Sequence, residues 1–132
     1  MSGTTIRPFL MFEGKAEEAM NLYVSLFPGS RVESISRYGA EGPGAEGTVQ
    51  LASLSLSGQT VLCIDSPAKH AFTFTPSFSF FADLETEDEL ERIAATLGEG
   101  GTILMPLGNY GFSRKFTWLN DRFGVSWQLN LP

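Results

Sequence analysis

The predicted secondary structure of this chain occurs twice in the same order, which restricts the possible folds severely. The first copy begins with a strand at residues 6–12. A helix follows, because apolar residues from Ala16 to Phe27 recur at i, i+3, i+4 and i+7. Pro28-Gly29 ends the helix, and three strands follow at residues 31–38, 49–57 and 61–65. The first half therefore has the order β-α-β-β-β.

The second half repeats this order. It begins with a strand at residues 78–83, and Thr86 and Glu89 then form a capping box at the start of a helix. Three strands are predicted after the helix, at residues 102–106, 114–119 and 125–131. Tyr38-Gly39 recurs as Tyr110-Gly111, which supports a repeat, although chance matching of turn residues is the alternative. We predict two modules, about residues 1–66 and 77–132, joined by a linker at about 67–76.

Two such modules predict a single α+β domain. Each sheet buries one face under its own helix, and its other face is covered if the modules pair as curled mixed sheets around a cavity. In the last strand, Val125, Trp127 and Leu129 alternate with more polar residues and are expected to face the helix. The residues expected to face the cavity are Ser77, Ser79, Phe81, Ser126, Gln128 and Asn130.

Composition excludes several classes of partner. A net charge of -6 argues against a nucleic-acid backbone as a ligand. The single cysteine, Cys63, has no partner for an internal disulfide, so a reducing compartment is expected. No apolar run approaches the roughly 18 residues of a membrane span. We expect a soluble, cytoplasmic protein with no membrane partner.

Five segments carry a family resemblance: IRPFLMF at 6–12, AEEAM at 16–20, SLFP at 25–28, HAFTFTP at 70–76 and FGVSWQ at 123–128. With the doubled module, they resemble the vicinal oxygen chelate superfamily, which includes glyoxalases, bleomycin-resistance proteins and extradiol dioxygenases. More narrowly, they resemble its PhnB-like branch, often labelled demethylubiquinone methyltransferase. The resemblance covers nearly the whole chain and implies a glyoxalase-like fold with a small-molecule cavity.

The resemblance also implies four metal-ligand positions, two in each module. They fall at Pro8, Cys63, Ser77 and Gln128, none of which is His, Glu or Asp. Asp65 lies near the second position, and a shift of one or two residues would bring it in. Stable sites for zinc, nickel or iron need about three or more good donors, so no metal and no other cofactor is expected.

The methyltransferase label finds little support in the residues. Gly42-Pro43-Gly44 lies in a glycine-rich stretch, residues 39–47, but Pro43 and the absence of a following helix do not suit a nucleotide-binding turn. We interpret this stretch as a surface loop or as a lid over the cavity. His70, in the linker, is either a general base or a structural loop residue.

Several other side chains have two interpretations. Tyr38 and Tyr110 are either cavity aromatics or core residues, and Arg114 either meets an anionic ligand or lies on an exposed edge. Trp118 suits either the core or the cavity. The full set of candidate ligand-binding residues is Pro8, Tyr38, Cys63, Asp65, Ser77, Ser79, Tyr110, Arg114, Trp118 and Gln128.

Two function classes remain open. The first is a metal-independent protein of the glyoxalase/bleomycin-resistance type that binds a small molecule. The second is an enzyme of the vicinal oxygen chelate superfamily acting on a small carbonyl or aromatic substrate. We favour binding, because no acid/base pair replaces the missing ligands. A homodimer is also expected, because Phe72, Phe74 and Phe112 lie outside the predicted core stripes.

Overall fold

The computed structural model describes residues 3–132 and divides the chain into two compact units, Met1–His70 and Ala71–Pro132. The boundary falls within the predicted linker. The first two residues of the first predicted module lie outside the described range.

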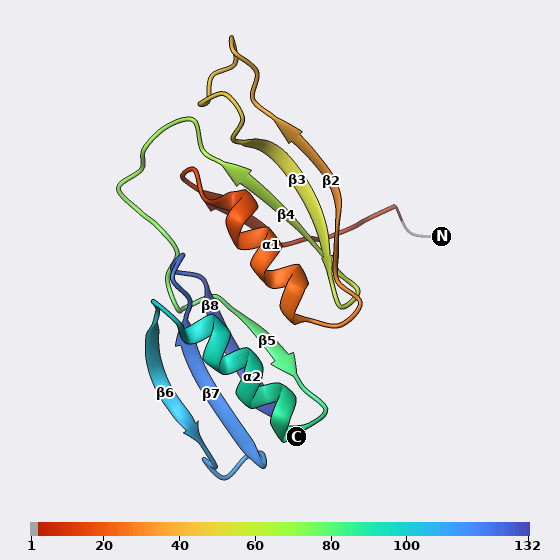
Figure 1. Cartoon of the computed structure of the whole chain (residues 1–132), viewed down its shortest axis with the longest axis vertical. Helices are drawn as coiled ribbons and strands as arrows, with labels where there is room; N and C mark the ends of the chain where they lie inside the picture. Colours follow the sequence, from red (N-terminus) through yellow and green to blue (C-terminus); the bar gives the residue numbers. More distant parts are fainter. Residues whose placement is uncertain (1–2) are drawn as a thin grey trace. The chain divides into compact units, whose positions relative to one another are not determined.

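Each unit contains one helix and one four-stranded mixed sheet (Figure 1). The elements of the first unit are β1 (Phe9–Phe12), α1 (Ala16–Leu26), β2 (Arg31–Arg37), β3 (Val49–Leu56) and β4 (Gln59–Asp65). Those of the second are β5 (Ser79–Asp83), α2 (Glu87–Gly98), β6 (Thr102–Gly108), β7 (Lys115–Asn120) and β8 (Ser126–Leu131). The predicted α+β fold with a doubled β-α-β-β-β order is confirmed.

The two sheets have the same topology. Their strand orders are β1-β4-β3-β2 and β5-β8-β7-β6. The first strand of each unit pairs in parallel with the last, and the other pairs are antiparallel. The cavity that paired modules are expected to enclose stays a prediction.

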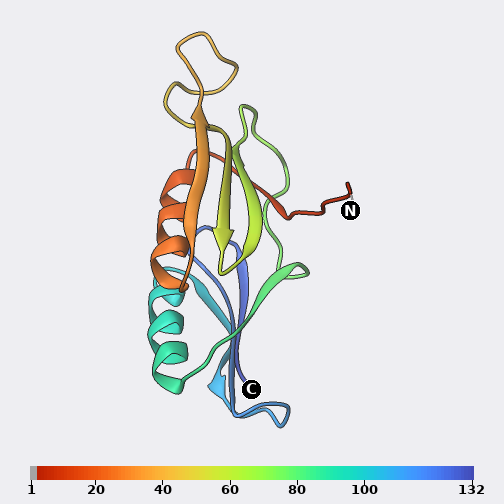
Figure 2. The same cartoon turned by 90° about the vertical axis from the view of Figure 1, so that its right-hand side faces the viewer.

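Helix α1 covers one face of the first sheet (Figure 2). Its apolar stripe is buried, and Tyr23 and Met20 have no exposed surface. The sheet residues buried on the same side include Ala52, Leu54, Val61 and Cys63. The opposite face carries the exposed rings and chains of Phe9 and Leu51.

Helix α2 begins where the capping box predicts. The Thr86 hydroxyl accepts a hydrogen bond from the Glu89 backbone N–H at 3.1 Å, which satisfies one free donor of the first turn. The Glu89 carboxylate accepts in return from the N–H of Glu85, one residue before the N-cap. The helix then buries Leu90, Ile93 and other apolar residues against β7 and β8.

The strand alternation predicted for β8 is confirmed. Trp127 and Leu129 are buried on the side of α2, and the Trp127 ring lies 4.8 Å from that of Phe80 on the neighbouring β5. Gln128 pairs with Phe81 of β5 and with Trp118 of β7, and therefore lies on the other face of the sheet. This second face, called the open face below, is the side turned away from α2.

Some predicted boundaries are wrong. The first strand begins at Phe9 rather than Ile6, because Pro8 has no N–H to donate. The Pro8 carbonyl still accepts from Leu62 N at 2.9 Å, so Pro8 lies beside β4 at the end of the ladder. Strand β6 continues past the predicted end to Gly108 through two irregularities in its pairing with β7.

Candidate functional site

Two predicted site residues, Ser79 and Trp118, meet at Ser126 on the open face of the second sheet. The Ser79 and Ser126 hydroxyl oxygens are 2.7 Å apart on paired positions of β5 and β8. The Trp118 indole N–H donates to the Ser126 oxygen at 2.8 Å. These three side chains form the serine–tryptophan network. Because the Ser126 oxygen accepts from Trp118, the hydroxyl proton of Ser126 is available for a hydrogen bond to Ser79. The pairing of β8 with β5 and β7 holds the three side chains next to one another.

Gln128 lies beside this network. It is half-buried, and it pairs with Trp118 across β7 and with Phe81 across β5. Within residues 3–132 its amide makes no hydrogen bond to protein, so two donors and an acceptor remain available. A primary amide between two aromatic side chains can orient a small planar molecule.

Four rings extend the open face at one end and form the aromatic cluster: Phe81, Tyr110, Phe112 and Phe116. Phe116 is buried at the centre, with its ring 4.9 Å from Phe112, 6.1 Å from Tyr110 and 6.2 Å from Phe81. The three outer rings remain about half exposed. Such a cluster offers aromatic surface for a ligand to stack on.

Next to Phe116, the open face carries an amide and a carboxylate. The Asn130 amide N–H donates to the Asp83 carboxylate at 2.9 Å, which orients the amide. The Asn130 Oδ1 atom is buried and has no hydrogen-bond partner among the described residues. The Asn120 Oδ1 atom, at the other end of the face, is also buried without a partner.

The first unit does not follow the predicted arrangement. Cys63 and Asp65 were expected on the cavity side, but both are buried on the side of α1, so their expected placement is wrong. The β4 residues whose side chains point the other way are Thr60, Leu62 and Ile64, because side chains alternate along a strand. Of these three, Thr60 carries the polar group, a neutral hydroxyl.

Asp65 is a structural anchor. One carboxylate oxygen accepts from the backbone N–H groups of Gly14 and Ala16 at 2.8 and 3.0 Å, and the other accepts from Val49 at 2.9 Å. It therefore supplies the start of α1 with a cap that Lys15 does not provide. The buried Tyr38 hydroxyl donates to the Asp65 carbonyl at 2.9 Å, which places Tyr38 in the core.

The loop at residues 39–47 packs on Tyr38. A Cβ atom added at Gly44 would lie 2.5 Å from a carbon of the Tyr38 ring, so the backbone of the loop sits directly against that ring. The loop joins two antiparallel strands, β2 and β3. The expected lack of a following helix is therefore confirmed.

The remaining predicted residues lie at the edges of the second unit. Ser77 is exposed, and its hydroxyl is 2.6 Å from that of Thr75. Tyr110 belongs to the aromatic cluster, and its hydroxyl donates to the Pro106 carbonyl at 2.6 Å. Arg114 donates to the Pro132 carbonyl at 2.7 Å.

The pKa of Glu87 on α2 is lowered mainly by its hydrogen bond from Lys115, and Arg114 contributes to the same shift.

His70 sits in the linker, at the end of the first unit. Its Nε2 atom is 2.9 Å from the Ser66 hydroxyl, which also interacts with the backbone of Ala68. These contacts belong to a local turn.

Cys63 is expected to resist thiol reagents in the folded protein. Burial, and then the charge of Asp65, raise the pKa of its thiol from 9.0 to about 12. At pH 8 the folded chain then holds roughly 1,000-fold less thiolate than a free thiol. Because the folded pKa is raised, this group's contribution to stability is complete below pH 9.0 and falls as the pH rises toward 12. A chromogenic disulfide reagent measures labelling with and without urea, and equal rates would contradict the expectation.

The donor atoms of the open face do not suit a divalent metal. No group of three or more His, Cys, Asp or Glu side chains comes together within the described part of the chain. On the open face of the second sheet the polar side chains are hydroxyls and amides, with Asp83 as the carboxylate. Neutral oxygens of this kind bind zinc, nickel or iron weakly.

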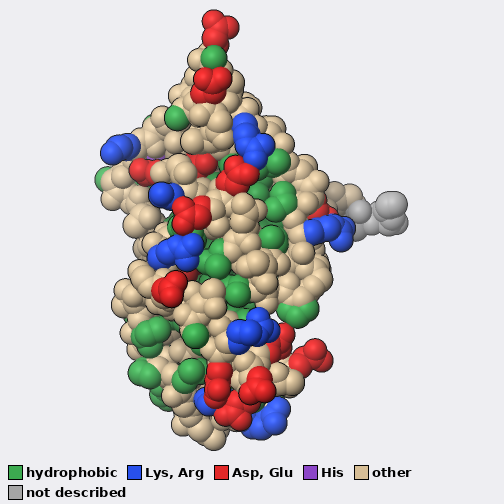
Figure 3. All heavy atoms as spheres, in the orientation of Figure 1, with side chains coloured by type: hydrophobic (Ala, Val, Ile, Leu, Met, Phe, Trp, Pro, Cys, Tyr) green, Lys and Arg blue, Asp and Glu red, His purple; other side chains and the backbone are tan. Residues whose placement is uncertain are grey.

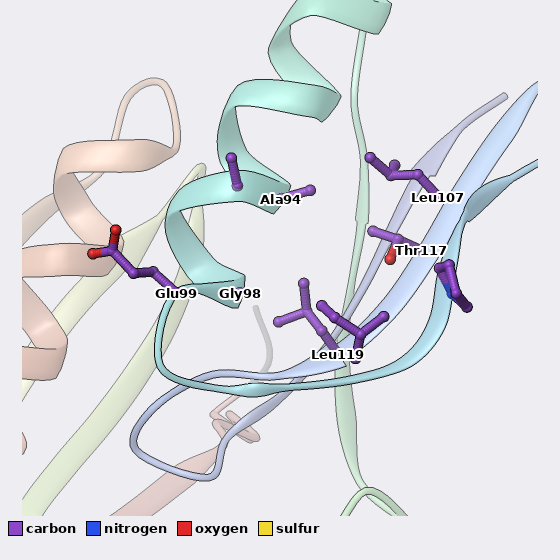
Figure 4. A pocket seen from close by; sticks show the side chains of 9 residues that line it. Ala94, Gly98, Glu99, Leu107, Thr117 and Leu119 are labelled. Atoms are coloured by element: carbon purple, nitrogen blue, oxygen red, sulfur yellow. The ribbon is translucent and has the colours of Figure 1, made fainter.

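A separate groove lies on the helix side of the second unit. It has a volume of about 450 Å³ between α2 and β6, and Ala94, Gly98, Leu107 and Leu119 are among the residues that line it (Figure 4). Nearby, apolar side chains gather at the surface over β6, where Ile103, Leu104 and Leu107 are exposed (Figure 3). A smaller hollow of about 320 Å³ in the first unit includes Asp65 and Lys69. Of the candidate ligand-binding residues, Asp65 lines the smaller hollow, and none lines the groove between α2 and β6.

The sequence profile of the 3-demethylubiquinone-9 3-methyltransferase family matches residues 4–130. The chain belongs to this family. The predicted resemblance to the branch that carries this label is thereby confirmed. No curated protein matches the chain. Among residues 3–132, the structure has no helix with the length and apolar character needed to cross a membrane.

Solved structures place this family member among similar folds. The PhnB protein from Bacillus cereus, described with the same methyltransferase name, is 57% identical, with a TM-score of 0.95 over 98% of this chain and 100% of its own. Protein PA1353 from Pseudomonas aeruginosa is 28% identical, with a TM-score of 0.83 over 98% of both chains. The fosfomycin resistance protein FosX from Mesorhizobium loti is 11% identical and shares the fold, with a TM-score of 0.66 over 100% of this chain and 94% of its own.

Proposed function

We propose that this chain is a metal-independent protein of the vicinal oxygen chelate superfamily that binds a small, partly aromatic molecule. The site is the open face of the second sheet. The observation that carries the proposal is the Gln128 amide, which makes no hydrogen bond to protein and lies between Trp118 and Phe81 beside two serine hydroxyls. Apolar walls with a few fixed polar groups are typical of small-molecule sites.

The fold supports this class of function. FosX, whose name describes resistance to a small antibiotic, has the same fold, and binding of a small molecule is the coarse property that we carry over. The methyltransferase label of the family is not part of the proposal. The glycine-rich loop at residues 39–47 is followed by a strand, whereas a nucleotide-binding turn opens a helix that meets the phosphates.

The proposal also covers the location of the protein and its partners. The protein acts in the cytoplasm, and two copies of the chain associate, since phenylalanine rings such as Phe72 and Phe112 are more than half exposed. Neither a nucleic acid nor a membrane is a partner, in keeping with the net charge of -6.

Gln128→Ala is expected to weaken binding of 2-acetylnaphthalene about fivefold, because a neutral hydrogen bond contributes roughly 1 kcal/mol. The probe offers a flat ring system for Trp118 and Phe81 and a carbonyl for the amide N–H. Quenching of tryptophan fluorescence measures the dissociation constant, and a chelator is expected to leave it unchanged.

Gln59→Ala is the matched control, because Gln59 is exposed in the first unit. Equal loss in both variants, or no saturable binding to the wild-type protein, would refute the proposal. Chemical conversion of the probe, followed by mass spectrometry, would instead support the enzyme alternative.

A further inference from the structure

The inference starts from the side-chain oxygen of Asn130 on the open face. Asn130 is 8% exposed, and its amide oxygen has no hydrogen-bond partner among the described residues. Leaving a buried acceptor unpaired costs roughly 1–3 kcal/mol, so such atoms are uncommon in native proteins. A donor from outside the chain would remove this cost.

The orientation of the Asn130 amide is fixed by its neighbour. The N–H group donates to the Asp83 carboxylate at 2.9 Å, and a flipped amide would turn its oxygen toward that negative charge. The Asn130 side-chain oxygen is therefore the atom that lacks a hydrogen-bond donor. Asp83 and Asn130 occupy paired positions on β5 and β8, so the sheet itself holds them together.

Two aromatic residues neighbour Asp83 and Asn130 on the open face. Phe116 is directly opposite Asn130 on β7, and Phe81 lies one step along the same face of β5. The Asn130 oxygen is covered in this structure, so a ligand reaches it when a neighbouring side chain turns aside. The ring of Phe81 is 55% exposed and has room to turn.

No basic side chain of the second unit competes for this position. Lys115 binds Glu87 and Glu91 of α2, Arg114 donates to Pro132, and Arg122 lies over the ring of Phe123. Arg92 belongs to α2, on the other side of the sheet. A carboxylate, an amide oxygen and ring faces are thus grouped without a cation, a combination that attracts one.

We infer that the open face of the second sheet binds an aromatic ligand carrying a protonated amine, which donates to the Asn130 oxygen beside Asp83. The inference rests on the proposed function and adds two features of the ligand: its positive charge, and a second contact at Asn130. The ring system lies against the aromatic cluster. The net charge of -6 favours the approach of a cation over that of an anion.

Three probes with one ring system test the inference: 2-naphthylmethylammonium, neutral 2-acetylnaphthalene and anionic 2-naphthoate. The ammonium is expected to bind the wild-type protein about tenfold more tightly than the neutral probe, because a hydrogen bond to a charged donor is stronger than one between neutral groups. The anion is expected to bind at least tenfold more weakly than the ammonium. Titration calorimetry measures all three affinities.

Two variants separate this role from a structural one. Asn130→Leu and Asp83→Asn are each expected to weaken ammonium binding roughly tenfold and to leave 2-acetylnaphthalene binding within about twofold. Asp88→Asn, the same change on the exposed surface of α2, is the matched control and is expected to alter neither. Asp83→Asn keeps an oxygen for the Asn130 amide and is expected to fold even if Asn130→Leu does not.

The outcomes are distinguishable. Equal affinities for the ammonium and the neutral probe would overturn this inference and leave the proposed function standing, as would an unchanged ratio of the two affinities in Asp83→Asn. Binding of none of the probes by the wild-type protein would overturn both. A ratio that falls toward one in Asp83→Asn, with Asp88→Asn unchanged, would support the inference, because a buried water on Asn130 would not produce it.

Discussion

Replacing Asp65 with alanine is expected to lower the free energy of unfolding by roughly 3–5 kcal/mol. The carboxylate is 3% exposed and accepts three backbone hydrogen bonds, from Gly14, Ala16 and Val49. Alanine would leave the buried N–H groups of Ala16 and Val49 without partners, at roughly 1–3 kcal/mol each before any relaxation, and the half-buried Gly14 N–H would lose its partner as well. The start of α1 would also lose the negative charge that its N-terminus favours.

Urea unfolding followed by circular dichroism measures the change in stability. Hydrogen exchange at the Ala16 and Val49 amides gives a local readout, since both are expected to lose protection. Glu46→Ala is the control, because it removes an exposed carboxylate from the loop of the same unit and is expected to change stability by less than about 0.5 kcal/mol. A loss below about 1 kcal/mol for Asp65→Ala would show that the anchor is dispensable.

The contrast between β4 and β8 shows where the sequence was informative. In β8, Ser126, Gln128 and Asn130 alternate with apolar residues, and this alternation predicts both faces correctly. In β4, residues 61–64 are apolar without interruption, so the pattern contains no information about which side chain faces α1. The expected position of Cys63 comes from the resemblance alone, and in the structure its side chain lies on the α1 side of the sheet.

The role of Asp65 could not be predicted for a different reason. A single acidic residue at the end of a strand is compatible with many roles. Its three donors lie 16 to 51 residues away along the chain, and they meet the carboxylate when β4 pairs with β1 and β3 and α1 packs on the sheet. The helix stripes, by contrast, are local patterns, and both helices appeared at the predicted positions.

The candidate site depends on a local sequence pattern and also on contacts between residues far apart in the chain. Alternation predicted that Ser79 and Gln128 share a face, and the structure adds the contacts that link Ser79, Ser126 and Trp118. The pairing of Asp83 with Asn130 joins residues 47 positions apart. Its consequence, an oriented amide with an unused oxygen, depends on strand register, and the sequence does not specify that register.

Replacing Gly101 with alanine is expected to lower the free energy of unfolding by at least about 3 kcal/mol. A Cβ atom at this position would lie 2.1 Å from the backbone oxygen of Asn120 and 3.0 Å from the carbonyl carbon of Asp121. Both are backbone atoms, so no side chain can move aside, and the start of β6 must separate from the end of β7. Overpacking that shifts the backbone costs roughly 1–3 kcal/mol and occasionally more, and a 2.1 Å contact belongs to the severe cases.

Gly29→Ala tests whether this cost comes from space or from backbone conformation. Gly29 and Gly101 each lie between a helix and the strand that follows it, but Gly29 has a φ of +70° and no neighbouring atom within 4 Å of an added Cβ. Its replacement is expected to cost about 1–2 kcal/mol, the penalty of a left-handed backbone for an L-residue. Urea unfolding of the two variants compares the costs. If Gly29→Ala were the more damaging change, the close approach of β6 to Asn120 would not be what requires glycine at position 101.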